Sequence, residues 1–252
     1  MALTLAQVFM QAQARVKAAP MDLAARSSLW QVFAVRGEWE RALAQLDMML
    51  RLDASWALEV QGCHALIDAE RLRSEVFAGR KPPVFLGPPP SWSGELVAGV
   101  DCVARGDRAA AQRHFARVLE DAQPRAGVLN GAAFEWICDA DARLGPCLEV
   151  VAQGRYVWIE FGSIRRVVCE PPAELRDVVW QPAKLEVDDT GSLDVFLPSR
   201  YPGAQTDEHR LARQTDWEDL GANVYLGQGQ KCLSTDAAMC GLLDVRELRL
   251  GH

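Results

Sequence analysis

The spacing of apolar residues changes once along this 252-residue chain, from a helical period to a strand period. In the first half, one stripe recurs every three or four residues, as on the buried face of an amphipathic helix: Trp39, Ala42, Leu43, Leu46, Met49 and Leu50. From residue 147 onward, "CLEVVAQGRYVWIEF" is rich in β-branched and aromatic residues around a turn at Gly154, which is typical of a β-hairpin. The sequence therefore predicts an α+β fold, with a helical domain over residues 1–142 and a β-rich domain over residues 143–252.

The helical half has the pattern of a row of two-helix repeats. Gly37 and Gly106 each separate two apolar stripes, and a glycine suits a tight turn because it has no Cβ. They lie 69 residues apart, about twice the 34-residue period of tetratricopeptide (TPR) repeats. Residues 55–77 are expected to form a degenerate middle repeat with its turn near Arg71. Three such hairpins would make a TPR-like array with one continuous core.

The proline-rich segment 79–91 interrupts the helical pattern. Its five prolines favour an extended backbone, so we expect a rigid bridge between the second and third hairpins. A docking motif for a proline-binding domain is the alternative.

Further strand candidates follow the hairpin at residue 147, separated by segments rich in glycine and proline. They lie at residues 177–187, 192–198, 223–235 and 241–250, with a turn at 188–191 between the first two. Strands of this number and length indicate a small, mainly antiparallel sheet or a partly open barrel.

Charge and cysteine content exclude several classes of protein. The formal net charge is −7, from 27 basic and 34 acidic residues, and phosphate recognition needs clustered basic residues, so a nucleic-acid binder is not expected. The seven cysteines form no CxxC pair, which indicates reduced thiols in a cytoplasmic protein. The N-terminal 20 residues show helical spacing rather than the continuous apolar run of an export signal.

Residues 196–217, "FLPSRYPGAQTDEHRLARQTDW", are dense in charged and aromatic side chains. Asp139 and Asp141 resemble the start of a calcium loop, but Arg143 occupies a ligand position, so no metal is expected. "GQGQ" at 227–230 is too short to cradle a phosphate, and no cofactor motif is found. We expect a structural polar lattice that holds the long loop on the sheet, formed by Asp139, Asp141, Arg143, Arg176, Arg200, Tyr201, Asp216 and Trp217.

An enzyme is the alternative interpretation of the same polar residues. A hydrolase site would use Asp139, Asp141, Arg200 and His209, but "QTDEHRLARQTDW", the segment around His209, contains no serine or cysteine nucleophile. His209 is expected to be a solvated histidine in a polar loop.

Several of these segments together resemble the ImpE/TagJ family of type VI secretion accessory proteins. The segments, in chain order, are "LWQVFAVRGEWERALAQLDMMLRLD", "DADARLGPCLEVVAQGRYVWIEF", "LRDVVWQPAKL", "FLPSRYPGA", "RQTDW", "GQGQKCL" and "LLDVREL". The resemblance implies a bacterial cytoplasmic protein without enzymatic activity. It also implies binding to a short helix of the small contractile-sheath subunit (TssB/VipA type) and a connection to the ClpV ATPase. Lys231 departs from the arginine expected in this family's "GQGQR"-like turn.

The partner helix is expected to dock on the inner face of the first hairpins. The candidate contacts are Arg26, Trp30, Phe33 and Arg36, since stacked helices present grooves suited to an amphipathic helix. Packing in the core is the alternative role for Trp30 and Phe33.

Overall fold

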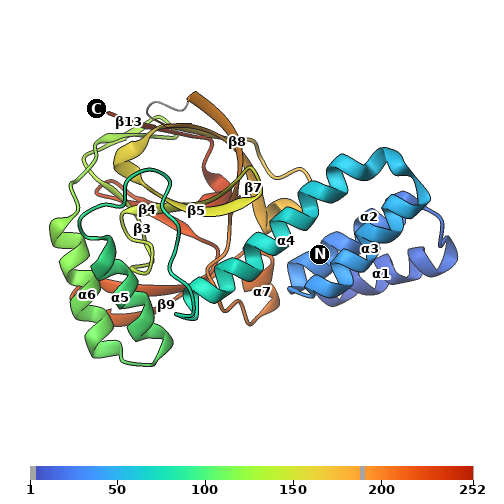
Figure 1. Cartoon of the computed structure of the whole chain (residues 1–252), viewed down its shortest axis with the longest axis horizontal. Helices are drawn as coiled ribbons and strands as arrows, with labels where there is room; N and C mark the ends of the chain where they lie inside the picture. The colour runs from blue at the N-terminus through green and yellow to red at the C-terminus, as the bar shows by residue number, and fades with distance from the viewer. Residues whose placement is uncertain (1–3, 188–190, 252) are drawn as a thin grey trace.

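The computed structural model describes residues 4–187 and 191–251. Six helices come first: α1 (Leu5–Ala18), α2 (Leu23–Arg36), α3 (Trp39–Leu52), α4 (Ala57–Phe77), α5 (Ser93–Ala104) and α6 (Arg108–Asp121). Figure 1 shows α1–α3 together at one end of the molecule, with α4 running from them to the strands. The strands follow, so the predicted α+β fold is confirmed.

Local sequence signals set the ends of the first helices. Thr4 and Gln7 form a capping box at the start of α1, and the carboxylate of Asp22 accepts hydrogen bonds from the first free backbone N–H groups of α2. Gly37 ends α2 at φ +72°, a conformation that costs a glycine little. The predicted turns at Gly37 and Gly106 therefore join α2 to α3 and α5 to α6.

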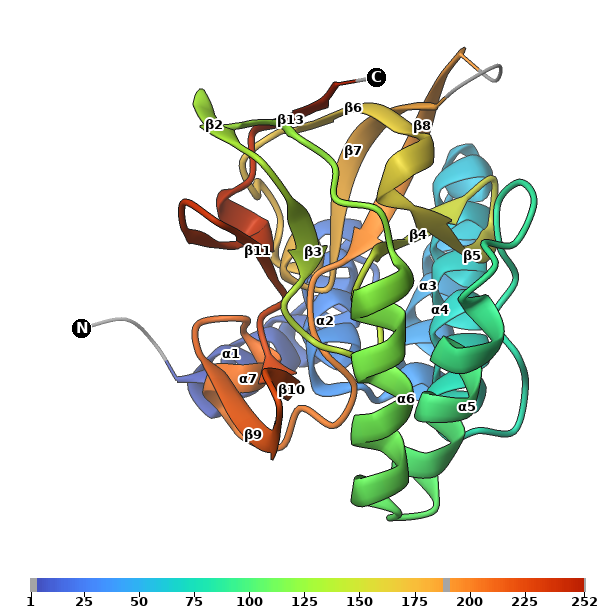
Figure 2. The ribbon, with the colours of Figure 1, turned by 90° about the vertical axis from the view of Figure 1, so that its left-hand side faces the viewer.

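The predicted middle hairpin is wrong, because residues 57–77 form one uninterrupted helix of 21 residues. Arg71 lies on its surface and pairs with Asp68 and Glu40. No glycine releases the backbone near Arg71, so the apolar face formed by residues such as Leu66, Ala69 and Val76 continues through the expected turn. Figures 1 and 2 show α5 and α6 side by side, at the other end of α4 from α1–α3.

The proline-rich bridge extends a sheet edge. Trp158 of strand β5 donates its N–H to the Val84 carbonyl at 2.8 Å and accepts from the Leu86 N–H at 2.8 Å. Phe85 between them makes a parallel bridge to Trp158. The segment connects α4 to α5 and covers the free edge of β5, which would otherwise present unpaired backbone groups.

Thirteen strands are described in the residues that the structure covers. The large sheet is antiparallel, as predicted, and its strands have the order β2-β1-β13-β6-β7-β8-β4-β5. Its strands are β1 (Gly127–Leu129), β2 (Ala132–Phe134), β4 (Cys147–Ala152), β5 (Arg155–Glu160), β6 (Ile164–Cys169), β7 (Trp180–Val187), β8 (Gly191–Pro198) and β13 (Glu247–Leu250). Residues 188–190 of the turn predicted between β7 and β8 lie outside the described residues.

Two smaller sheets complete the fold. One has the order β12-β11-β3, and the other pairs β9 with β10. Their strands, with the short helix α7 that precedes β9, are β3 (Ile137–Asp139), α7 (Asp207–Arg210), β9 (Thr215–Gly221), β10 (Val224–Gly229), β11 (Cys232–Thr235) and β12 (Met239–Gly241).

The helical character ends earlier than predicted, at Asp121, and β1–β3 lie within the segment expected to be helical. Strand β6 was not predicted, and β9 begins within the polar stretch expected to be a loop. Three-residue strands are too short to show a period, and β1 and β3 pair with β13 and β11 from the end of the chain. No helix within residues 4–187 and 191–251 is long and apolar enough to span a membrane.

Candidate functional site

A buried set of charged side chains joins α4 to the strands. We call Arg73, Asp139, Glu149, Lys231 and Tyr201 the junction cluster. Arg73 of α4 donates two hydrogen bonds to the Glu149 carboxylate of β4, Nε to Oε2 at 2.8 Å and Nη2 to Oε1 at 2.7 Å. Lys231, fully buried after β10, donates its Nζ to the same carboxylate at 2.9 Å. Glu149 is thus shared between two cations.

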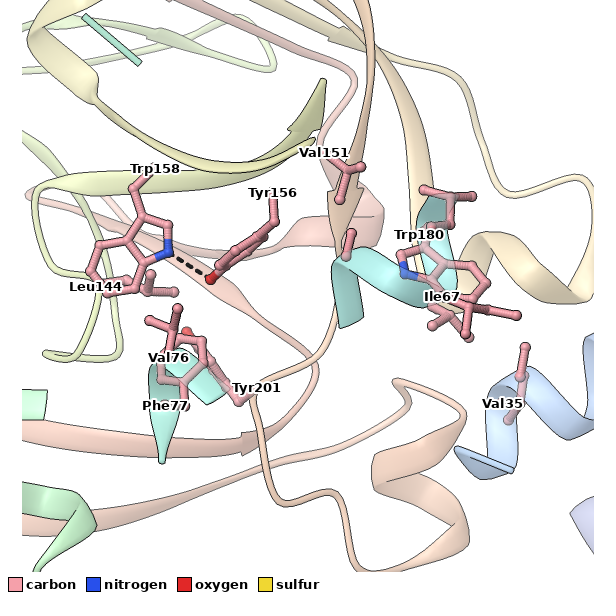
Figure 3. Close-up of a cluster of buried hydrophobic side chains, with 14 of the residues drawn as sticks. Val35, Ile67, Val76, Phe77, Leu144, Val151, Tyr156, Trp158, Trp180 and Tyr201 are labelled. Atoms are coloured by element: carbon pink, nitrogen blue, oxygen red, sulfur yellow. Dashed lines mark hydrogen bonds between the residues drawn. The ribbon is translucent and has the colours of Figure 1, made fainter. Parts of the chain in front are cut away.

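Aromatic side chains complete the bonding of Glu149. The Tyr156 hydroxyl donates to Oε2 of Glu149 at 2.6 Å. It also accepts from Trp158 Nε1 at 2.6 Å, the bond drawn in Figure 3. Phe77 of α4 packs against Trp158, with ring centroids 5.9 Å apart. The carboxylate is therefore enclosed between α4 and the sheet.

Asp139, at the end of β3, is the second carboxylate of the cluster. Its Oδ1 accepts from the Tyr201 hydroxyl at 2.7 Å, and its Oδ2 lies 3.3 Å from Lys231 Nζ. The Tyr201 hydroxyl also accepts from the backbone N–H of Cys232 at 3.0 Å. Tyr201 follows β8, so the cluster ties the long polar loop to β3 and β11.

Asp141 and Arg143 form a neighbouring buried ion pair. Arg143 donates its backbone N–H to Asp141 Oδ1 at 2.8 Å and pairs with the same carboxylate through its side chain. The other oxygen of Asp141 accepts from the Gly227 N–H at 2.7 Å, and the Gly227 carbonyl accepts from Arg143 Nη2 at 2.8 Å. The first three residues of the "GQGQ" segment belong to strand β10, and the ion pair holds this strand at Gly227.

The two carboxylates of the cluster have opposite pKa shifts. Burial opposes ionisation of Glu149, but Arg73 and Lys231 outweigh it and lower its pKa to about 2. Burial raises the pKa of Asp139 to about 6, because Lys231 and the Tyr201 hydrogen bond compensate only in part. A high pKa in a buried carboxyl group can mark a functional site, but here the carboxyl group is held by neighbouring side chains in the interior.

The raised pKa of Asp139 predicts a pH dependence of stability. Between about pH 4 and pH 6 the folded protein holds a proton on Asp139 that the unfolded chain has lost. The contribution of Asp139 to the free energy of unfolding therefore falls as pH rises through this window, by up to about 3 kcal/mol. We expect the difference in free energy of unfolding between the wild type and Asp139→Asn, measured by urea titration, to decrease from pH 4 to pH 7.

The Asp139→Asn difference isolates one group. The stability that Glu149 contributes declines as pH falls below its unfolded pKa of 4.5, but Glu149 is common to both proteins and its effect largely cancels in the difference. A difference that is constant, or that increases with pH, would contradict the assigned direction.

Comparisons with known proteins support the resemblance. The family model described as "ImpE protein" matches residues 131–249. The type VI secretion system accessory component TagJ of Pseudomonas aeruginosa is 42% identical over 241 residues, covering 94% of this chain and 84% of that protein. The chain belongs to the ImpE/TagJ family. The crystal structure of protein VPA1032 from Vibrio parahaemolyticus resembles this fold with a TM-score of 0.90 at 25% identity, covering 98% of this chain and 94% of that one.

Of the other candidate residues of this ImpE/TagJ chain, Trp217 touches the cluster, and Arg176 and Asp216 make separate contacts. Trp217 packs edge-on against Tyr201, with ring centroids 5.7 Å apart. Arg176, in the 3₁₀ turn that precedes β7, lies 5.8 Å from the Trp30 ring and 3.1 Å from Glu174, and so links this turn to α2. Asp216 of β9 lies with its Oδ2 2.9 Å from Nε2 of His209, within hydrogen-bonding distance.

His209 is not solvated as expected, since it is only 2% exposed. The α7 turn places it beside Gly229 of β10, and its Nε2 contacts Asp216. The hydrolase alternative needs His209 near Asp139 and Asp141, and no contact joins them in the described ranges. In those ranges no group of three or more histidine, cysteine or acidic residues could hold a metal ion.

The structure places the four candidate partner contacts in two environments. Trp30 and Phe33 are buried, and Arg26 is bonded to the Pro20 carbonyl and Gln45. Arg36 is half-buried and lies 4.5 Å from the centre of the Phe9 ring. Of the four, Arg36 is therefore the one placed to contact a partner directly. The other three side chains are buried and support the surface around it.

Sequence reasoning missed three members of the cluster, Arg73, Glu149 and Lys231. One signal was available for Glu149, because strand alternation puts it on the same face as the buried Cys147 and Val151. A charged residue at a core-facing position needs a buried partner. Arg73 carries a similar signal, because it lies four residues after Ala69 and three before Val76 on the buried face of α4, but its partner Glu149 is 76 residues away in the sequence.

Proposed function

We propose that this protein is a non-enzymatic cytoplasmic adaptor of the bacterial type VI secretion system. It binds a short helix of the small contractile-sheath subunit and links the sheath to its ClpV-type ATPase. Two findings support the proposal: membership of the ImpE/TagJ family, and the name of the Pseudomonas relative as an accessory component of that system.

A groove between α1 and the α2–α3 hairpin is the binding surface that we assign to the partner helix. It has a volume of about 270 Å³, and its walls include the apolar side chains of Val16, Leu29 and Phe33. Lys17 and Arg41 lie at the same groove, and Arg41 is 4.2 Å from the Phe33 ring centre. An apolar floor with basic neighbours suits an amphipathic helix that has acidic residues beside its apolar anchors.

Filling this groove is expected to weaken sheath-subunit binding. Ala44 is an exposed residue of α3 at the groove wall, so an arginine there adds bulk without disturbing the core. We expect Ala44→Arg to weaken binding of the cognate small sheath subunit at least about tenfold, which corresponds to about 1.4 kcal/mol. Isothermal titration calorimetry with the purified subunit measures this change.

The matched control is Ala14→Arg, on an exposed position of α1 outside the groove residues. It adds the same charge and volume and should bind like the wild type. Equal affinities of the two variants would reject this groove. The adaptor proposal itself fails if the wild-type protein and the cognate subunit form no complex.

A further inference from the structure

A second pocket lies where the helices meet the loop that follows β8. It has a volume of about 250 Å³, and its walls include Gly37, Glu70, Phe77, Tyr201 and Ala204. Figure 3 shows Phe77 and Tyr201 side by side at this junction, and Tyr201 also belongs to the junction cluster. The volume suits one acidic side chain or a small organic acid.

The walls of this pocket are strongly basic. They carry four arginines and one carboxylate, Glu70. Three of the arginines have a carboxylate partner: Arg36 pairs with Glu38, Arg73 with Glu149, and Arg210 with Asp207. In the described part of the chain, no carboxylate forms an ion pair with the fourth, Arg200.

Arg200 is only 9% exposed, so its charge is poorly solvated. Its Nη1 donates to the backbone carbonyls of Val35 at 2.8 Å and Arg210 at 2.7 Å. Its Nε and Nη2 make no hydrogen bond within residues 4–187 and 191–251. Glu70 is already engaged, since it accepts from Trp180 Nε1 at 3.1 Å and lies 3.6 Å from Arg73.

The electrostatic surroundings of Arg200 favour an anion. Burial lowers its pKa to about 10; Glu70 opposes this shift, and the charges of Arg73 and Arg210 add to it. A buried cation without a counterion is costly, and a bound anion would remove that cost. The geometry of a guanidinium edge with two free donors matches a planar carboxylate. A phosphate dianion would be repelled more strongly by Glu70.

We propose that this pocket binds a carboxylate group, held by Arg200 and flanked by Arg210 and Arg36. The carboxylate belongs to an acidic side chain of a protein partner or to a small free acid. This site is separate from the α1 groove, so its existence does not depend on the sheath interaction proposed above.

A tethered carboxylate tests the pocket without a ligand. Ala204 is half-buried in the pocket wall, and Ala204→Glu places a carboxylate there, while Ala204→Gln adds nearly the same volume without charge. We expect the glutamate variant to melt about 2–4 °C above the glutamine variant at low ionic strength, and the gap to narrow in high salt. Equal melting temperatures would overturn the proposal.

Glutarate serves as the free probe in a calorimetric titration at constant ionic strength. The wild type should bind it saturably, and Ala204→Glu should lose at least about 90% of that affinity, since its own carboxylate occupies the site. Arg200→Gln, provided that it folds, should also lose binding. No saturable binding to the wild type, or equal affinity in Ala204→Glu, would contradict the proposal.

Competition identifies the source of the carboxylate. If glutarate displaces the purified sheath subunit, the pocket receives an acidic side chain of that partner. If both bind together, the pocket takes a free acid. Ala44→Arg, which tests the α1 groove, should leave glutarate affinity unchanged, so the two proposals can fail separately.

Discussion

Replacing Glu149 with glutamine is expected to lower the free energy of unfolding by about 3–5 kcal/mol at pH 7. The substitution preserves side-chain volume and leaves no cavity. It removes the negative charge that Arg73 and Lys231 share, although both cations remain buried. Equilibrium urea denaturation followed by tryptophan fluorescence measures the loss.

The size of this effect follows from the hydrogen bonds around the carboxylate. Glu149 accepts from Arg73, Lys231 and Tyr156, so both of its oxygens are used. A glutamine would point its NH₂ group at one of these donors and leave a donor facing a donor. The lowered pKa of about 2 indicates the same preference for the charged form.

An exposed pair supplies the control. Lys184 Nζ lies 2.7 Å from Asp194 Oδ1, but the two side chains are 66% and 85% exposed. Asp194→Asn is therefore expected to cost less than about 1 kcal/mol. If Glu149→Gln were no more destabilising than Asp194→Asn, the cluster would not hold the helices to the strands.

The sequence predicted the elements that carry a clear period. The hairpin at residues 147–161 appears as β4 and β5, and Gly37 and Gly106 turn the chain as expected. These features depend on residues close in sequence, so a pattern reveals them. The continuous α4 was missed because an array of equal hairpins was assumed where no glycine allowed a turn.

The junction cluster could be predicted only in part. Asp139 and Tyr201 were singled out because polar residues are dense around them. Arg73, however, is a charged residue on the buried face of α4, and nothing in the sequence shows that its partner lies on β4. Its partner is fixed by the packing of α4 on the sheet, which is a tertiary property. The same limit explains Lys231, since a lysine after a strand is usually solvent-exposed.

Gly229→Ala is the second change with a large expected effect, about 3 kcal/mol of destabilisation. Gly229 has a φ of +95°, which a residue with a Cβ adopts at a cost of about 1–2 kcal/mol. An added Cβ would also lie 2.0 Å from the backbone carbonyl oxygen of Gln214 and 2.9 Å from the His209 ring. Forcing an atom into such a site costs about 1–3 kcal/mol more.

This glycine also anchors the junction cluster, because its carbonyl accepts from the Tyr201 N–H at 2.8 Å. Displacing β10 to make room for a methyl group would therefore move Tyr201 away from Asp139. Gly62→Ala is the matched control, since Gly62 lies away from the ends of α4 on its exposed side, with no atom within 4 Å of an added Cβ. Alanine there should stabilise the protein by up to about 1 kcal/mol. The melting temperatures and urea midpoints of the two variants should therefore shift in opposite directions. A Gly229→Ala variant as stable as the wild type would contradict the close packing described for Gly229.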